Sequence, residues 1–193
     1  MNRLGVLAAL CAWTMAVPTL AVQPAAGFTK SDVARVDRLL RLVQERLEMA
    51  PENAATKWKT MSRIEDSMSE QAVITAVRTR SAQLGLDAEL AARFAQAQID
   101  AAKIIQAARH RQWAADASAA PARNVAADGF KASTPEPEVG PAMLRALRDA
   151  SVVLRRRGGR AVLDARAADL IQVGGADLLA GQAALKPLYD IAK

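Results

Sequence analysis

Apolar residues recur at three- and four-residue intervals along most of the chain beyond residue 30. This is the spacing of one helix face, and it predicts a first amphipathic helix over residues 31–49. Its apolar positions are Val33, Val36, Leu39, Leu40, Val43 and Leu47. Pro51 has no amide hydrogen for a helix interior, so it predicts the end of this helix. Residues 52–65 are polar and mixed, and we interpret them as a connection.

Two more helices follow, each with a recognisable start. Residues 67–70 read Ser-Met-Ser-Glu, the pattern of a capping box, in which a hydroxyl and a carboxylate satisfy the free amides of a helix start. The helix that it opens extends to about residue 83, and Gly85 is its predicted C-cap. Asp87 is the predicted cap of a third, long helix that fades near residue 116.

The remaining chain divides into an irregular segment and a second helical block. Residues 118–141 are rich in Ala, Pro and Gly without periodicity, which predicts a linker or long surface loop. Beyond it, glycine pairs separate three predicted helices, at about 142–157, 160–173 and 176–191. We expect an all-α bundle in which the block 142–193 packs on the same domain as the helices of residues 22–117.

The first 21 residues have the pattern of a secretory signal peptide. A basic start is followed by an apolar run over 4–16, then Pro18 and small residues. The run is too short for a comfortable membrane span. We predict cleavage near Ala21, with Ala26 as the alternative, and a periplasmic or secreted protein without stable membrane insertion. An uncleaved anchor is the other interpretation.

The composition limits the kinds of site that the chain can form, but it does not identify a binding partner. Without the leader's Arg3, 25 Lys+Arg stand against 20 Asp+Glu, a modest positive balance that suits a small anion, a polyanion or an anionic surface. Few aromatic residues argue against a nucleic-acid platform. The only cysteine, Cys11, lies in the leader and the only histidine is His110. We therefore predict no metal or cofactor, and interpret His110 as a surface residue.

Charged and amide residues follow one another at suggestive intervals. Arg46 lies in the first helix, Lys57 comes eleven residues later, and Asp66 nine after that. Glu70 lies one turn further on, and Gln106 lies in the long third helix. The segments Glu-Arg-Leu-Glu at 45–48, Lys-Trp at 57–58 and Ile-Glu-Asp-Ser at 64–67 resemble the exported subclass of the all-helical chorismate mutases. The resemblance covers residues 31–113, and over 142–193 only the helical pattern agrees.

This resemblance implies the chorismate mutase II type of helical bundle with an extra C-terminal block, chorismate as the substrate and a possible homodimer. It also implies a role for each residue. Arg46 would bind a carboxylate, while Lys57 and Gln106 would donate to the ether oxygen on which charge develops. Asp66 and Glu70 would present the helix start and a carboxylate to the ring hydroxyl.

The sequence departs from the family pattern at three positions. Ser69 stands where the family has a second-helix arginine, Ala102 where it usually has Ser or Thr, and Val73 where it has a glutamine. Losing one buried charged contact to an anion costs about 2–5 kcal/mol. We still assign Ser69 and Ala102 to the predicted substrate-binding site, at the positions that the resemblance gives them. The cations that could compensate are Arg63, Lys103, Arg145 and Arg148.

Other interpretations stay open at this point. The scaffold could be a weakened or inactive binder of a small dicarboxylate, or an isochorismate-type pyruvate lyase. Arg46 and Glu45 also fit a solvated helix face, and Asp66 and Glu70 fit a cap without further function. Finally, the triplet Arg155-Arg156-Arg157 at a helix end could engage an anionic surface or a partner.

Overall fold

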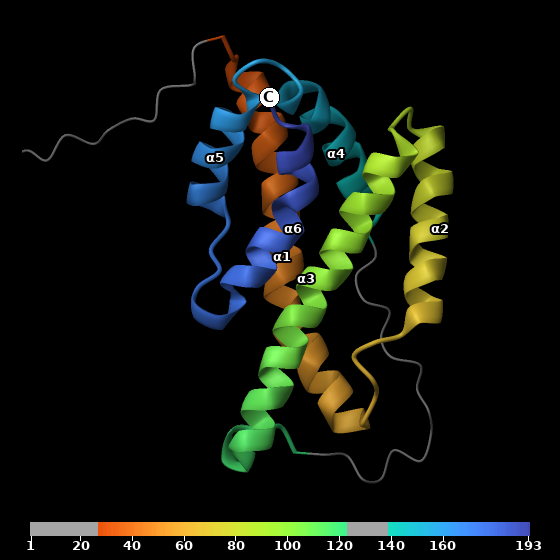
Figure 1. Cartoon of the computed structure of the whole chain (residues 1–193), viewed down its shortest axis with the longest axis vertical. Helices are drawn as coiled ribbons and strands as arrows, with labels where there is room; N and C mark the ends of the chain where they lie inside the picture. The colour runs from red at the N-terminus through yellow and green to blue at the C-terminus, as the bar shows by residue number, and fades with distance from the viewer. Residues whose placement is uncertain (1–26, 123–138) are drawn as a thin grey trace, which may run out of the picture.

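The structure, a computed structural model, describes residues 27–122 and 139–193. The described residues form six α-helices and no strand, so the prediction of an all-α bundle is confirmed (Figure 1). The predicted leader and most of the predicted linker, residues 123–138, lie outside the described residues. The helices are α1 Lys30–Thr60, α2 Ser67–Gln83, α3 Ala88–Ala115, α4 Pro141–Leu154, α5 Gly159–Leu170 and α6 Leu178–Ile191. Two short 3-10 helices are η1 Ala117–Ala119 and η2 Gly175–Asp177.

Helix α1 is longer than its sequence predicts. Thr29 and Asp32 cap its start reciprocally, and Pro51 lies inside it rather than at its end. Proline in a helix interior costs about 3 kcal/mol. Ala50 and Ala54, on either side of it, are fully buried, so tertiary packing outweighs the local cost. The prediction that residues 52–65 form a connection is therefore wrong for its first nine positions.

The caps around α2 confirm two predictions and correct a third. The N-cap of α2 is Asp66 rather than Ser67, one position before the predicted box. Gly85 follows the C-cap Leu84 with φ +66, a left-handed conformation that glycine adopts without strain. Asp87 accepts hydrogen bonds from two amides at the start of α3, which confirms it as that helix's cap.

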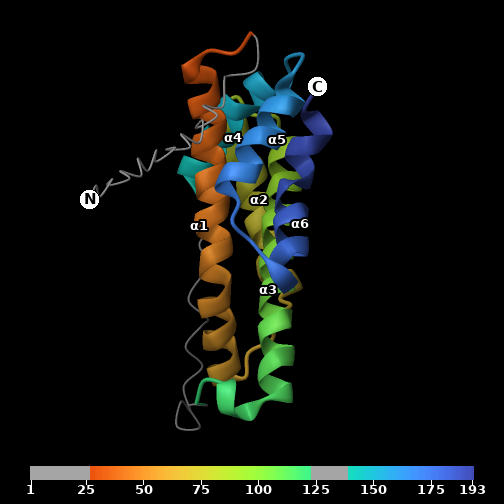
Figure 2. The ribbon, with the colours of Figure 1, turned by 90° about the vertical axis from the view of Figure 1, so that its left-hand side faces the viewer.

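The long helices α1 and α3 form the centre of the molecule and run in the same direction (Figures 1 and 2). Helix α2 packs on α3, α4 and α5 pack on α1, and α6 packs along α3. The C-terminal helices share one core with the first half of the chain, around Leu39, Leu90, Phe94, Leu147 and Leu188, each fully buried. Figure 2 shows that the final turns of α1 and α3 extend beyond this block.

The C-terminal helices are shorter than predicted by up to three residues at an end. The two glycine pairs do separate them. Gly158 adopts φ +87, and Gly159 lies so close to Leu154 that a β-carbon there would be 2.2 Å from the Leu154 carbonyl oxygen. None of the helices that the structure describes is long and apolar enough to span a membrane.

Candidate functional site

Lys57 and Gln106 meet between α1 and α3. The Lys57 Nζ donates to Gln106 Oε1 at 3.0 Å and to the Ile64 carbonyl at 3.3 Å. Gln106 is fully buried. Because an ammonium group can only donate, it is the oxygen of the carboxamide, not its Nε2, that faces Lys57. The structure thus brings together two predicted site residues that are 49 positions apart in the sequence.

Arg46 lies on the same face of α1 as Lys57. Eleven residues bring a helix almost back to its starting direction, about 16 Å further along its axis. Arg46 is only 7% exposed, and the buried Ala50 and Ala54 lie between the two cations on this face. Burying a guanidinium group costs free energy unless polar groups accept hydrogen bonds from it. This face of α1 therefore presents two cations toward the interior of the bundle.

The start of α2 is built from Asp66 and Ser69. The Ser69 amide donates to Asp66 Oδ1 at 3.1 Å and its hydroxyl to Oδ2 at 2.7 Å. The Asp66 amide donates in turn to Glu70 Oε1 at 3.3 Å. The Ser69 hydroxyl bond lowers the pKa of Asp66 most, the Ser69 amide adds to it, and the nearby charge of Lys57 contributes. Asp66 is therefore an anion close to Lys57.

Lys103 from α3 forms an ion pair with Glu70. Its Nζ lies 3.0 Å from one Glu70 oxygen and 3.2 Å from the other, and 3.7 Å from Asp100. Burial lowers the pKa of Lys103, but the hydrogen bond and charge of Glu70 and the charge of Asp100 raise it by more. Lys103 therefore stays charged, and its charge is largely balanced by two acids.

The other proposed cations occupy different places. Arg63 is exposed in the connection between α1 and α2, and Arg145 is exposed on α4. Arg148 donates to the Leu84 carbonyl at the far end of α2. That is about 22 Å along the helix from Ser69, so Arg148 lies far from the start of α2. Ala102 is buried and offers no donor.

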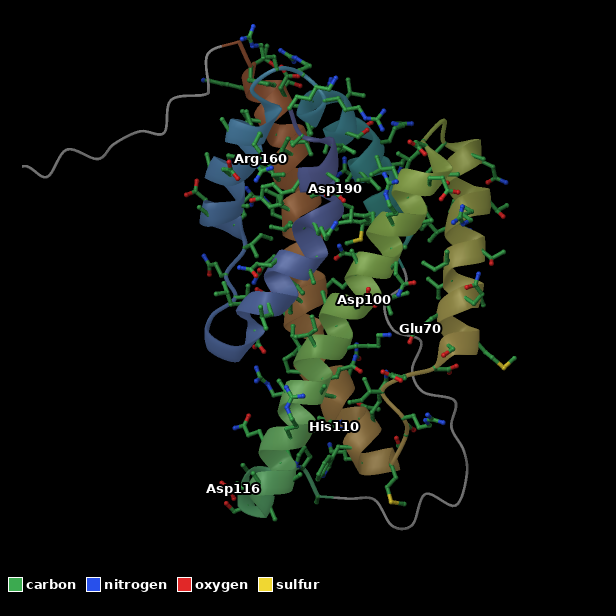
Figure 3. All side chains as sticks on the ribbon, viewed as in Figure 1. Glu70, Asp100, His110, Asp116, Arg160 and Asp190 are labelled. Atoms are coloured by element: carbon green, nitrogen blue, oxygen red, sulfur yellow. The ribbon has the colours of Figure 1, made fainter. Side chains whose placement is uncertain are left out.

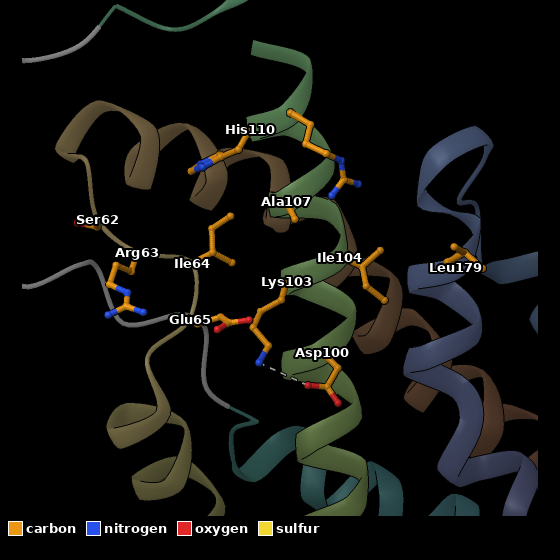
Figure 4. A pocket seen from close by; sticks show the side chains of 11 residues that line it. Ser62, Arg63, Ile64, Glu65, Asp100, Lys103, Ile104, Ala107, His110 and Leu179 are labelled. Atoms are coloured by element: carbon orange, nitrogen blue, oxygen red, sulfur yellow. Dashed lines mark ion pairs between the residues drawn. The ribbon is translucent and has the colours of Figure 1, made fainter. Parts of the chain in front are cut away.

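A cavity of about 860 Å³ borders this region (Figure 4). Its walls come from the α1–α2 connection, one face of α3 and α6. They consist of Ser62, Arg63, Ile64, Glu65, Asp100, Lys103, Ile104, Ala107, His110, Arg111 and Leu179. Arg46, Lys57 and Gln106 are not among them. The cavity and the Lys57–Gln106 contact share Ile64, whose carbonyl accepts from Lys57.

His110 is not the surface residue that the sequence suggested. It is half-buried, and its Nε2 lies 2.9 Å from the Ala54 carbonyl oxygen. Its ring contacts Trp58 and Trp113. The sequence did contain a sign that His110 lies inward, because it follows the predicted site residue Gln106 by one turn of the same helix. Figure 3 shows His110 in the lower part of the molecule, below Glu70 and Asp100 and far from Arg160 and Asp190.

Two arginines of the triplet 155–157 have structural partners. Arg156 pairs with Asp32 at 2.9 Å, donates to the Gly27 carbonyl and lies over the Phe28 ring. Arg155 lies 3.5 Å from Asp87. The Arg156 contacts tie the described start of the chain to the α4–α5 turn, and the Arg155 contact ties the end of α4 to the start of α3. Over residues 27–122 and 139–193, no group of His, Cys, Asp and Glu side chains could hold a metal ion.

Comparisons with known proteins agree on the fold. No protein-family profile matches the chain, and no curated protein matches it in sequence. The solved chorismate mutase of Burkholderia thailandensis is similar in structure, with a TM-score of 0.64, 24% identity, and 80% of this chain and 99% of that one covered. The chorismate mutase of Burkholderia phymatum has a TM-score of 0.61 and 20% identity, with 82% and 98% covered. The shared fold therefore extends over nearly the whole of both enzymes.

Proposed function

We propose that the chain is an exported chorismate mutase, which rearranges chorismate to prephenate without covalent or acid–base catalysis. One observation carries the proposal. The Lys57 ammonium meets the buried Gln106 carboxamide at 3.0 Å, on the face of α1 that also holds the buried Arg46. Two cations and an oriented amide in the interior of this fold suit a small dianion whose charge shifts during the reaction.

The reaction needs no proton or nucleophile, since one C–O bond breaks as one C–C bond forms within the same molecule. Negative charge builds on the ether oxygen as the C–O bond breaks. Lys57 and the Nε2 of Gln106 donate to that oxygen, and Arg46 binds a carboxylate with its planar pair of donors. Fixed donors and a clamp on the compact conformer supply the rate enhancement.

Helix α2 contributes less to anion binding than its counterpart in the family pattern. Ser69 gives its hydroxyl to Asp66, and Glu70 binds Lys103. The start of α2 therefore brings no unbalanced positive charge to the substrate. The proposal accordingly includes reduced activity relative to a site with the family's arginine.

The decisive experiment is an assay of the purified protein without residues 1–21. Loss of the chorismate diene absorbance is followed together with product identity, and prephenate is the expected product. Lys57→Ala should lower kcat about 10²- to 10³-fold, the usual loss for one donor at a developing oxyanion. Lys59→Ala, an exposed lysine two residues away, is the matched control and should keep the parent activity.

The same variants separate the alternative functions. Arg46→Ala should weaken substrate binding, whereas Arg41→Ala, exposed on the same helix, should not. Saturable binding of chorismate without turnover, abolished in Arg46→Ala, would instead indicate a non-catalytic binder. Pyruvate released from isochorismate would indicate a lyase. Neither turnover nor binding would contradict the proposal altogether.

Export is proposed from the N-terminal pattern alone. The full chain, produced in a Gram-negative host, should appear in the periplasmic or extracellular fraction with its first residue after Ala21 or Ala26. Mass spectrometry of the intact protein measures this directly. A cytoplasmic protein that still begins at Met1 would contradict export and leave the enzymatic proposal standing.

A further inference from the structure

Aromatic side chains join the final turns of α1 and α3. The Trp58 ring lies 5.2 Å from the His110 ring and 5.6 Å from the Trp113 ring, both in edge contact. These separations are in the range in which aromatic pairs attract each other. His110 adds a directional contact, because its Nε2 lies 2.9 Å from the Ala54 carbonyl oxygen. A carbonyl can only accept, so Nε2 carries a proton in this contact.

The end of α1 depends on such contacts because Pro51 precedes it. A proline has no amide hydrogen, so the Leu47 carbonyl loses its partner four residues later in the helix. Helices bend most readily at such a position. Pro51 lies between Arg46 and Lys57. The direction of the segment that carries Lys57 is thus fixed by what it packs against.

The His110 contact and the Lys57 contact are neighbours on both helices. Ala54 lies three residues before Lys57 on α1, and Gln106 lies four residues before His110 on α3. Residues three or four apart share a helix face. Because α1 and α3 run in the same direction, the Ala54–His110 and Lys57–Gln106 contacts join the same two helix faces and cross at about the same level. A shift at the first contact moves the backbone that carries the second.

We propose that His110 is a positioning residue: its bond to the Ala54 carbonyl and its contact with Trp58 hold the Lys57 ammonium against the Gln106 carboxamide. The kinetic part of this inference rests on the proposed function. Its structural part does not, because the Lys57–Gln106 contact exists without substrate. Misplacement of a catalytic group by about 1 Å can cost about 10²-fold in rate, so a small change at His110 should be measurable.

The test compares two substitutions of the same residue. His110→Phe keeps an aromatic ring and removes the donor, whereas His110→Gln keeps an amide donor and removes the ring. Gln112→Leu, at an exposed position two residues further along α3, is the control. We expect His110→Phe to lower kcat about 10- to 100-fold with little change in KM. His110→Gln should recover most of the loss, and the control should match the parent.

A second readout needs no turnover. The side-chain amide signals of Gln106 in a ¹H–¹⁵N correlation spectrum are assigned by their absence in Gln106→Leu. They should shift in His110→Phe and return toward the parent position in His110→Gln. A merely structural role would lower the melting temperature and leave these signals unchanged in the folded protein. If His110→Phe does not fold, Trp58→Phe carries the same test at the ring contact.

The outcomes are distinct. Shifted Gln106 signals together with a loss in kcat support the proposal. Shifted signals in a protein whose parent has no mutase activity support the positioning and overturn the proposed function. Unchanged signals and unchanged kcat in a folded His110→Phe variant overturn the positioning role.

Discussion

Replacing Gln106 with glutamate tests the proposed mechanism at its centre. The carboxamide oxygen accepts from Lys57 at 3.0 Å, and in the proposed mechanism the Nε2 group donates to the ether oxygen of the substrate. A carboxylate at this position would still accept from Lys57. It could no longer donate, and its charge would repel the negative charge that builds in the transition state. Only the protonated acid would restore the donor.

Two estimates of the loss agree. Removing one donor at a developing oxyanion lowers the rate about 10²- to 10³-fold. With an ordinary glutamate pKa of about 4.3, roughly one molecule in 10³ is protonated near pH 7.3. Activity of the Gln106→Glu variant should therefore rise about tenfold for each unit by which the pH falls, and level off near the pKa of the new carboxyl group. The parent protein should show no such rise, because an amide needs no proton to donate.

The assay is kcat/KM for chorismate between pH 4.5 and 8, with circular dichroism at each pH to confirm folding. Gln112→Glu adds the same charge at an exposed position of α3 and should follow the parent profile. A Gln106→Glu variant with parental activity at pH 7.5 would refute the reasoning. So would a profile parallel to that of the parent, because either result means that Gln106 does not donate to the reacting oxygen.

Three further predictions concern activity and stability. Ser69→Arg should raise kcat/KM about 30- to 4,000-fold, the gain from about 2–5 kcal/mol of anion binding, in the same absorbance assay. Asp32 has its pKa lowered from 3.8 to about 2, first by the Thr29 amide and then by Arg156. The ionised Asp32 therefore stabilises the folded protein above about pH 4, and this contribution is lost as the pH falls toward 2. In the Asp32→Asn variant, the urea midpoint should depend less on pH across this range. Gly159→Ala should destabilise by about 2 kcal/mol or more in urea melts, because its β-carbon would meet a backbone oxygen at 2.2 Å. Gly174→Ala, with nothing within 4 Å, should change stability by less than about 0.5 kcal/mol.

Periodicity predicted the helices well because most of them follow an apolar stripe buried against a neighbour. Pro51 marks where local rules failed. Its cost is local, while the packing of Ala50 and Ala54 that outweighs it becomes visible only in the assembled bundle. Asp66 shows a smaller error of the same kind, since a capping box and a single aspartate cap are close alternatives in sequence.

The candidate site was less predictable from the residues alone. Spacing places Arg46 and Lys57 on one face of α1, but nothing in it shows that Gln106 meets Lys57. That pairing depends on how α3 lies against α1, and the family resemblance implied only that both residues would donate to one oxygen of the substrate. Arg148 illustrates the opposite case. From the sequence alone, Arg148 was one of the arginines that could lie near Ser69. The fold instead places it at the other end of α2, beside Leu84.

Under the proposed function, the charges around α2 indicate which kinetic constant should reflect the presence of Ser69 in place of an arginine. Arg46 and Lys57 lie on α1, whereas Asp66 and Glu70 make the start of α2 acidic, and Lys103 is balanced by Glu70. In the proposed mechanism, the deficit of positive charge therefore lies at the second carboxylate of the dianionic substrate. That carboxylate keeps its charge from ground state to transition state, so a contact to it is uniform binding. Loss of uniform binding raises KM and leaves kcat largely intact. If the proposed mechanism holds, the weakness introduced by Ser69 should appear as a high KM, while Lys57 and Gln106, which are proposed to meet the oxygen that gains charge, should set kcat.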